Sequence, residues 1–219
     1  MMGLFQVPGS KYQVRPERVV TTFDVRPVFA SLRPASPGRP FDIRRMTLFD
    51  RFTTERLLAD RLREGHFDNL LRMDRDPRIM RTLGGVRTEE ESRKYLQRNL
   101  DHWEEYGVGP WMLTLRDGEN FVGRAYLRFL DITGTDEIGL GYALIPEYWG
   151  MGLATEIASA IIDIAFSQLA FDSVIAGSLP DNLASRKVLE KIGGRCEMET
   201  VYKGLPHVVY RIGRPNRGG

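Results

Sequence analysis

The spacing of hydrophobic residues changes several times along the chain, and each change predicts a different element. Residues 54–62 alternate imperfectly between apolar and polar positions, which predicts a short strand. Residues 64–75 carry apolar residues at helical spacing, so a helix is expected there. That helix should stop before Asp76-Pro77, because the residue preceding a proline disfavours helical geometry.

A capping box predicts the start of a second, longer helix. The Thr88 hydroxyl can accept from the Glu91 amide while the Glu91 side chain reaches back, and Gly107 is a typical helix end. Three segments that alternate apolar and polar residues follow, at 111–115, 121–130 and 137–145. Turn residues separate them, so the pattern predicts three consecutive antiparallel strands.

The second half of the chain alternates between strand and helix. Residues 153–169 are apolar on most faces, which predicts a buried helix. A strand, a helix capped by Asp181-Asn182 and a final hairpin follow, at 171–178, 183–192, and 195–202 with 206–212. An antiparallel run followed by strand, helix and strand requires a mixed sheet with helices on both faces.

Composition divides the chain near Met46. The first 45 of the 219 residues hold eight Lys or Arg, three Asp or Glu and six of the twelve prolines. Proline sustains neither helix nor central strand, so 1–45 is expected to be a basic extension, poorly ordered or loosely docked. Residues 46–219 are expected to form one domain. We favour a solvated tail over a tail that binds nucleic acid, although the basic charge of the segment leaves nucleic-acid binding open.

Several function classes are not favoured. The longest apolar run, 153–170, is interrupted by charged residues, so no membrane span is expected. The lone Cys196 excludes an intramolecular disulfide and suits a reducing cytoplasm, which is the expected location. The three histidines are scattered and have no spacing for a catalytic triad or a metal site.

The stretch EYWGMGLA, residues 147–154, carries the candidate chemistry. Gly150 and Gly152 stand between a predicted strand and a predicted helix, where backbone amides lack partners and can bind phosphate. A nucleotide triphosphatase would add a Gly-Lys-Ser/Thr string, which the sequence does not contain. A dinucleotide fold would place glycine where Thr155 stands. The two glycines therefore indicate a phosphate-binding site, but they do not identify the ligand that carries the phosphate.

The context of these glycines is more specific. GLGYALIP at 139–146 leads into EYWGMGLATE, and DNLASRKVLEKIG at 181–193 comes later. This pairing resembles the GNAT superfamily of acetyl-CoA-dependent N-acetyltransferases, most of all the branch with ribosomal-protein-alanine acetyltransferases. The resemblance covers residues 52–212 and includes TERL at 54–57. It implies an α/β fold with a mixed, mostly antiparallel seven-stranded sheet and helices on both faces.

The resemblance also implies residues that hold acetyl-CoA. The family's pyrophosphate loop falls on 149–154, with Trp149 in place of the usual Arg or Gln. The implied cofactor positions are Tyr142, Ala143 and Leu144 beside the pantetheine, Gly150, Met151, Gly152, Leu153, Ala154 and Thr155 on the pyrophosphate, and Asn182 on the cofactor arm. Asn182 could instead be a plain helix cap.

The catalytic assignments are less specific. Ser185 matches a serine placed near the CoA sulfur in related enzymes, although a surface helix serine would look the same. The branch often has an acidic residue where this chain has Gly139. Glu137 points to the same side of that strand and is the nominated base, against a solvent-exposed carboxylate at the edge of a turn.

The implied reaction moves an acetyl group from acetyl-CoA directly to a primary amine. At pH 7 the deprotonation of a lysine, with a pKa of about 10.4, costs about 4.6 kcal/mol. The deprotonation of an α-amine, with a pKa of about 7.7–8.0, costs only about 1.1–1.4 kcal/mol. A weak base therefore favours a protein N-terminus as acceptor. An antibiotic, polyamine or amino acid stays open as acceptor, as does a non-catalytic acyl-CoA-binding module. The sequence leaves the oligomeric state open, a homodimer included.

Overall fold

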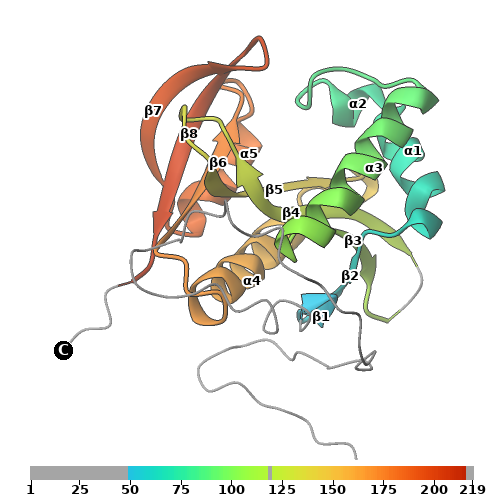
Figure 1. Cartoon of the computed structure of the whole chain (residues 1–219), viewed down its shortest axis with the longest axis horizontal. Coiled ribbons are helices and arrows are strands. Elements are labelled where there is room, and N and C mark those ends of the chain that lie inside the picture. The colour runs from blue at the N-terminus through green and yellow to red at the C-terminus, as the bar shows by residue number, and fades with distance from the viewer. Residues whose placement is uncertain (1–48, 118–119, 216–219) are drawn as a thin grey trace, which may run out of the picture.

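The structure is a computed structural model that describes residues 49–117 and 120–215 (Figure 1). The expectation for residues 1–45 lies outside this part of the chain, as does the middle of the predicted turn at 117–120. An eight-stranded sheet forms the centre, in the order β1-β2-β3-β4-β5-β6-β8-β7. Its strands are β1 (Arg51–Thr53), β2 (Leu57–Arg61), β3 (Pro110–Leu115), β4 (Phe121–Leu130), β5 (Glu137–Leu144), β6 (Ser173–Ser178), β7 (Arg195–Tyr202) and β8 (Leu205–Gly213).

The sheet confirms the expected fold class. Neighbouring strands are antiparallel except β5 and β6, which are parallel. The sheet has eight strands where seven were expected, because β1 precedes the strand predicted at 54–62. A turn at Thr54 separates the two, with the Thr54 amide donating to the Leu57 carbonyl over 2.8 Å.

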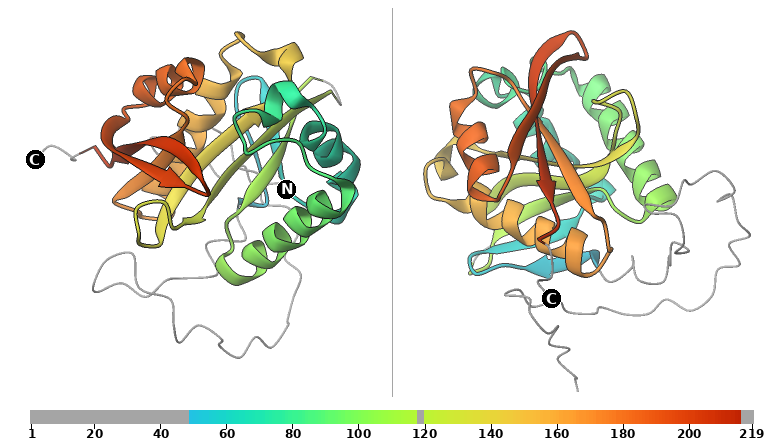
Figure 2. Two further views of the ribbon diagram at one scale, coloured as in Figure 1. Left: turned by 90° about the horizontal axis from the view of Figure 1, so that it is seen from above. Right: turned by 90° about the vertical axis from the view of Figure 1, so that its left-hand side faces the viewer.

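Helices cover both faces of the sheet (Figures 1 and 2). On one face lie α1 (Phe67–Asp74), α2 (Pro77–Met80) and α3 (Glu89–Tyr106), and on the other lie α4 (Leu153–Ser167) and α5 (Leu183–Lys191). Short 3-10 turns, η3 (Glu64–His66) and η4 (Pro146–Tyr148), precede α1 and α4. None of the described helices combines the length and the apolar character needed to cross a bilayer.

Local signals in the sequence explain most helix boundaries. The capping box of α3 is present, with the Glu91 amide 3.2 Å from the Thr88 hydroxyl, and Gly107 ends the helix at φ 61°. The short α2 was not predicted. Pro77 occupies its first turn and the Asp76 carboxylate caps it by accepting from the Arg78 amide over 2.9 Å. Proline there starts a helix, because its missing amide proton is not needed at that position.

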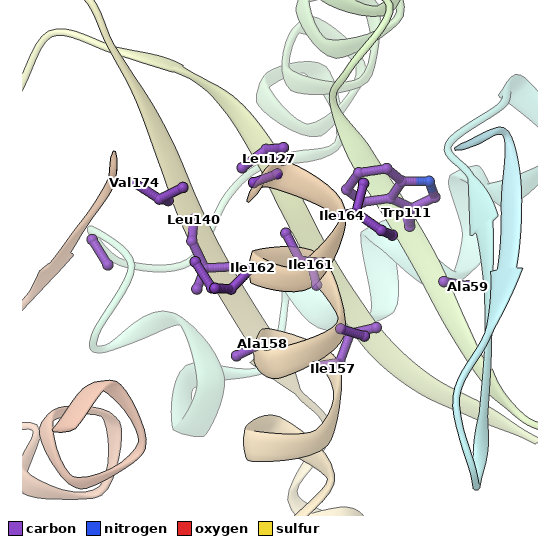
Figure 3. Packing of buried hydrophobic residues seen from close by; sticks show 14 of the residues in the cluster. Ala59, Trp111, Leu127, Leu140, Ile157, Ala158, Ile161, Ile162, Ile164 and Val174 are labelled. Atoms are coloured by element: carbon purple, nitrogen blue, oxygen red, sulfur yellow. The ribbon is translucent and has the colours of Figure 1, made fainter. Parts of the chain in front are cut away.

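The buried helix α4 holds the largest part of the core. Ile157, Ala158 and Ile161 are fully buried against the sheet. Figure 3 shows them beside Leu127 of β4 and Leu140 of β5. Full burial of a side chain as large as isoleucine stabilises the fold by about 1.5–3 kcal/mol. The start of α4 is therefore fixed firmly relative to the sheet.

The parallel pair at the centre of the sheet separates soon after it forms. β5 and β6 are in register at Gly139 and Ile175. Beyond this point β5 continues along β4 to Leu144, while β6 continues along β8 to Ser178. Each strand thus keeps its outer neighbour, and the facing edges of β5 and β6 part. The site described next lies where they part.

Candidate active site

A single cavity of about 880 Å³ occupies the region around the parted strands. Its walls include the start of α4, the start of α5, the inner ends of β5 and β6, and the β7–β8 hairpin. The opposite wall comes from α2, the segment 81–87 and α3. The hairpin and the α1–α3 group lie on opposite sides of β5 (Figure 1). One continuous space therefore joins the glycine corner to the facing edges of the sheet.

The glycine corner has the geometry of an anion site. Gly150 and Gly152 have φ values of 76° and 79°, in the left-handed region that favours glycine. A backbone bond from Glu156 to Gly152, 3.1 Å long, is the first of α4. The earlier amides of α4, at Leu153, Ala154 and Thr155, therefore lack intrahelical acceptors, and all three residues line the cavity.

Nine of the ten positions expected to hold the cofactor line this cavity, and Met151 does not. The Met151 side chain is 52% exposed, and its carbonyl accepts from Arg56 Nη1 over 2.9 Å. Trp149, half-exposed, donates its indole N–H to the Leu144 carbonyl over 2.7 Å. It ties the corner to the end of β5, and as a neutral side chain it adds no charge. Anion binding at the corner would therefore fall to the backbone amides.

The segment before β2 braces the corner from behind. The Glu156 carboxylate accepts from the Arg56 amide over 2.8 Å and from Arg56 Nε over 2.7 Å, and also from the Thr54 hydroxyl. Burial raises the pKa of Glu156, but these bonds together lower it below its usual value. An ionised carboxylate in the first turn also suits the positive end of the helix dipole. The TERL segment thus holds the start of α4, which the sequence did not suggest.

Tyr142 and Ser185 meet at the cavity wall. The Tyr142 hydroxyl lies 3.2 Å from the Ser185 hydroxyl and 3.2 Å from its carbonyl. Asn182 caps α5 by accepting from the Ser185 amide over 3.2 Å, and all three residues line the cavity. Burial is the main cause that raises the pKa of Tyr142 to about 12. The phenol therefore stays protonated and can donate a hydrogen bond.

Glu137 lies elsewhere. It is not among the residues that line the cavity, and its carboxylate accepts from Arg211 Nη2 over 3.1 Å and from the Thr133 hydroxyl over 2.7 Å. The hydrogen-bonded Arg211 is the main cause that lowers the pKa of Glu137. A carboxylate with a lowered pKa and occupied oxygens is a weaker base. This geometry does not support the expected role of Glu137.

His207 is a cavity residue that the sequence did not single out. Its Nδ1 lies 2.9 Å from the Leu205 carbonyl, which can only accept, so Nδ1 carries a proton and Nε2 is left with a lone pair. A Cβ added to Gly177 would lie 3.2 Å from the His207 ring, which places the imidazole over β6 just beyond the point where β5 and β6 part. Only the register of β8 against β6 reveals this position.

His102 also lines the cavity, but both of its nitrogens are occupied. Nδ1 lies 2.7 Å from the Val108 carbonyl, and Nε2 accepts from the Phe129 amide over 3.2 Å. Burial is the main cause that lowers its pKa, so the ring stays neutral. Among the described residues no group of three or more His, Cys, Asp or Glu side chains could hold a metal ion.

A buried carboxylate organises the wall opposite Tyr142. Asp74 is fully buried and accepts from Arg87 Nη1 over 2.7 Å, from Arg124 Nη1 over 3.1 Å and from the Ser92 hydroxyl over 2.9 Å. Both guanidinium groups stack over Tyr95, 4.6 and 4.7 Å from its ring centre. One carboxylate thus fixes two arginines at the cavity.

Comparison with known proteins identifies related chains. Residues 56–195 match the family model described as an acetyltransferase (GNAT) domain. An uncharacterized N-acetyltransferase, YnaD of Bacillus subtilis, is 29% identical over 147 residues, which cover 66% of this chain and 82% of YnaD. An acetyltransferase from Agrobacterium tumefaciens superposes with a TM-score of 0.67 at 25% identity, over 75% of this chain and 94% of that chain.

A structure of the ribosomal L7/L12 α-N-protein acetyltransferase RimL with coenzyme A has the same fold. Its TM-score is 0.62 at 16% identity, over 73% of this chain and 95% of RimL. At this identity the likeness concerns the fold alone. It nevertheless shows that a sheet of this kind accommodates coenzyme A in at least one protein.

Proposed function

This chain belongs to the GNAT acetyltransferase family, and on that premise we propose that it transfers the acetyl group of acetyl-CoA directly to the α-amine of a peptide or protein N-terminus. One observation carries the proposal. A single cavity connects the amide-lined corner at Gly150 and Gly152 with the place where β5 and β6 part. A long donor with phosphates at one end and a thioester at the other suits such a space.

The donor would lie along β5. The amides at the start of α4 would bind the pyrophosphate, as helix starts bind phosphate in general. The facing edge of β5, from Tyr142 to Leu144, would pair with the amide groups of the pantetheine in the manner of an added strand. Asn182 and Ser185 border the same path from α5. The thioester would then lie between β5 and β6.

The leaving sulfur would meet Tyr142 and Ser185. When the amine attacks the thioester carbonyl carbon, the C–S bond breaks and its electron pair leaves with the sulfur. A phenol with a pKa of about 12 does not readily protonate a thiolate, because thiols have pKa values of about 8.5. Tyr142 would therefore stabilise the thiolate by a hydrogen bond instead of giving up its proton.

The attacking amine must lose a proton, and His207 is the acceptor that the geometry offers. Its Nε2 has a lone pair and its ring lies over β6 beside the cavity. An imidazole is only a modest base, so an amine that is already partly neutral is the better acceptor. An α-amine, with a pKa of about 7.7–8.0, meets this requirement more easily than lysine.

A peptide with one free α-amine and one lysine tests the proposal. We expect a 42 Da increase on the α-amine (the mass of one acetyl group), and none when that amine is blocked in advance. Modification confined to the lysine would contradict the acceptor. Solved structures of this fold include an aminoglycoside acetyltransferase, so a panel of small amines belongs in the same experiment. Binding of acetyl-CoA without turnover on any amine would indicate a non-catalytic module.

The Glu137→Gln variant shows whether the carboxylate of Glu137 has a structural or a catalytic role. We expect kcat to fall less than threefold, whereas loss of a general base typically costs about 10²- to 10⁴-fold. The folded-state pKa is lowered from its ordinary 4.5, so the ion pair with Arg211 stabilises the protein above that pH and is lost as the pH falls through the lowered value. The variant should therefore melt earlier at pH 7, and this difference should shrink below pH 4.5. A loss of turnover without a change in melting temperature would restore Glu137 as the base.

A further inference from the structure

Resting on the proposed function, we infer that the acceptor is an acidic peptide, with Asp or Glu directly after the N-terminal residue. Six arginines line the wall of the cavity formed by α2, the segment 81–87, α3 and β4, namely Arg78, Arg81, Arg87, Arg98, Arg124 and Arg128. No Asp or Glu is found among the described residues that line the cavity. Every charged side chain that the acceptor would meet in this cavity is therefore positive.

The arginines of β4 flank the reaction site. Tyr126 is the register partner of Gly141, and a Cβ on Gly141 would fall 2.2 Å from the Tyr126 ring, so this ring covers the strand. Arg124 and Arg128 stand two residues to either side of Tyr126, on the same face. Same-face neighbours on a strand lie about 7 Å apart. Carboxylates one or two residues beyond an amine can reach that far.

Arg128 is the clearest unmatched charge. Its Nη1 donates to the Asn99 amide oxygen over 3.1 Å, and its guanidinium stacks 4.5 Å from the Tyr126 ring centre. Its Nε is buried and has no hydrogen-bond partner among the described residues. Arg128 is partly buried, and a cation that is partly removed from water without an anionic partner is destabilising, so a bound carboxylate would reduce that cost. The planar guanidinium also suits a carboxylate better than a lysine would.

The remaining arginines extend this charge to the rim. Arg81 and Arg98 are exposed and form no ion pair with any residue that the structure describes. Arg78 is paired with Asp76, which lies outside the cavity wall. A wall that runs from the buried Arg124 to these exposed side chains is longer than one carboxylate needs. It fits a peptide with several acidic residues better than a single amino acid.

The effect of this charge is visible on Tyr95. Burial raises the pKa of this phenol, yet the charges of Arg124, Arg128 and Arg87 lower it below its usual value. The same field would act on the acceptor, because nearby positive charge disfavours an ammonium. It would attract the acidic residues and keep the amine neutral for attack. For the same reason a polycationic acceptor would be repelled.

Peptide binding tests this inference independently of turnover. Calorimetry on the CoA-loaded protein would compare Ala-Asp-Glu-Ala with Ala-Asn-Gln-Ala and Ala-Lys-Lys-Ala, which share the α-amine. We expect the acidic peptide to bind at least tenfold more tightly than the amide peptide, with a preference that weakens as salt is added. Equal binding would overturn the inference. Tighter binding of free aspartate than of the acidic peptide would overturn the peptide assignment.

Two variants of one helix show whether the arginine wall is responsible. Arg98→Gln removes an exposed charge of α3 that faces the cavity, and Arg93→Gln removes one that does not line it. We expect Arg98→Gln to weaken the acidic peptide at least fivefold, with no change for the amide peptide or for acetyl-CoA. Arg93→Gln should leave all three unchanged. Equal effects of the two variants would overturn the inference, whereas loss of transfer to every amine would instead count against the proposed function.

Discussion

The Gly152→Glu variant is expected to lose acetyl-CoA binding by at least about 100-fold, or about 2.7 kcal/mol, measured by calorimetry. Gly152 adopts φ 79°, where a side chain is strained. A carboxylate at this position would also repel the pyrophosphate at the positive end of α4. The added Cβ would lie 3.5 Å from Arg56 Nη2, so the new side chain would compete with Glu156 for the arginine that braces the corner.

Gly134→Glu is the matched control for this experiment. Gly134 has φ 87°, its Cβ would meet nothing within 4 Å, and it does not line the cavity. Both variants thus bring the same residue into the same backbone region. We expect similar losses of thermal stability, with acetyl-CoA binding lost only at Gly152. Normal binding by a folded Gly152→Glu protein would refute the proposed phosphate site.

The Asp74→Asn variant is expected to lose about 3–5 kcal/mol in the free energy of unfolding, because it leaves the buried Arg124 and the partly buried Arg87 without their anion. Asparagine has nearly the same shape, so the change removes charge and little packing. Arg124 is 5% exposed and cannot turn to water, while Arg87 is only partly exposed. Urea unfolding with two-state analysis measures the effect. A loss below about 1 kcal/mol would mean that Asp74 is not the essential counter-ion of this wall.

Asp76→Asn provides the comparison two residues along the chain. Asp76 caps α2, and asparagine caps a helix about as well. Its ion pair with Arg78 is at the surface, where solvent screens such pairs and they contribute little to stability. We expect the unfolding free energy of this variant to stay close to that of the unchanged protein. The contrast between the two variants would attribute the larger loss to burial of the charges.

Local signals allowed most of the fold to be predicted. The capping box at Thr88 and the glycine at 107 need only neighbouring residues, and both boundaries of α3 are confirmed. The predicted stop before Asp76-Pro77 agrees with the end of α1 at Asp74. The short α2 that follows was missed, because a single turn has no periodicity to reveal it. The break between β1 and β2 was missed for a related reason. It depends on the bonds that hold Thr54 to Leu57 and to Glu156, which lies 102 residues away.

The same distinction between neighbouring and distant residues applies to the candidate site. The corner at Gly150 and Gly152 depends on consecutive residues, and both glycines line the cavity. The surroundings of Glu137 could not be foreseen, because Arg211 reaches it from β8, 74 residues further along the chain. His207 and the arginine wall were missed because their side chains come from several segments, some of them far apart in the sequence, namely α2, the segment 81–87, α3, β4 and β8. Their meeting depends on strand register, which single-sequence patterns do not specify.

Because β5 and β6 part, the stability of the folded chain should depend on whether a ligand occupies the space between them. Beyond Gly139 and Ile175 the two facing edges lack each other as partners, and unpaired backbone groups away from water are costly. A ligand that supplies amide groups there would complete the ladder. At a free concentration 100 times its Kd, such a ligand adds about 2.7 kcal/mol to the stability of the folded state. If acetyl-CoA is that ligand, the resistance of the folded chain to heat and proteases should rise with the concentration of acetyl-CoA.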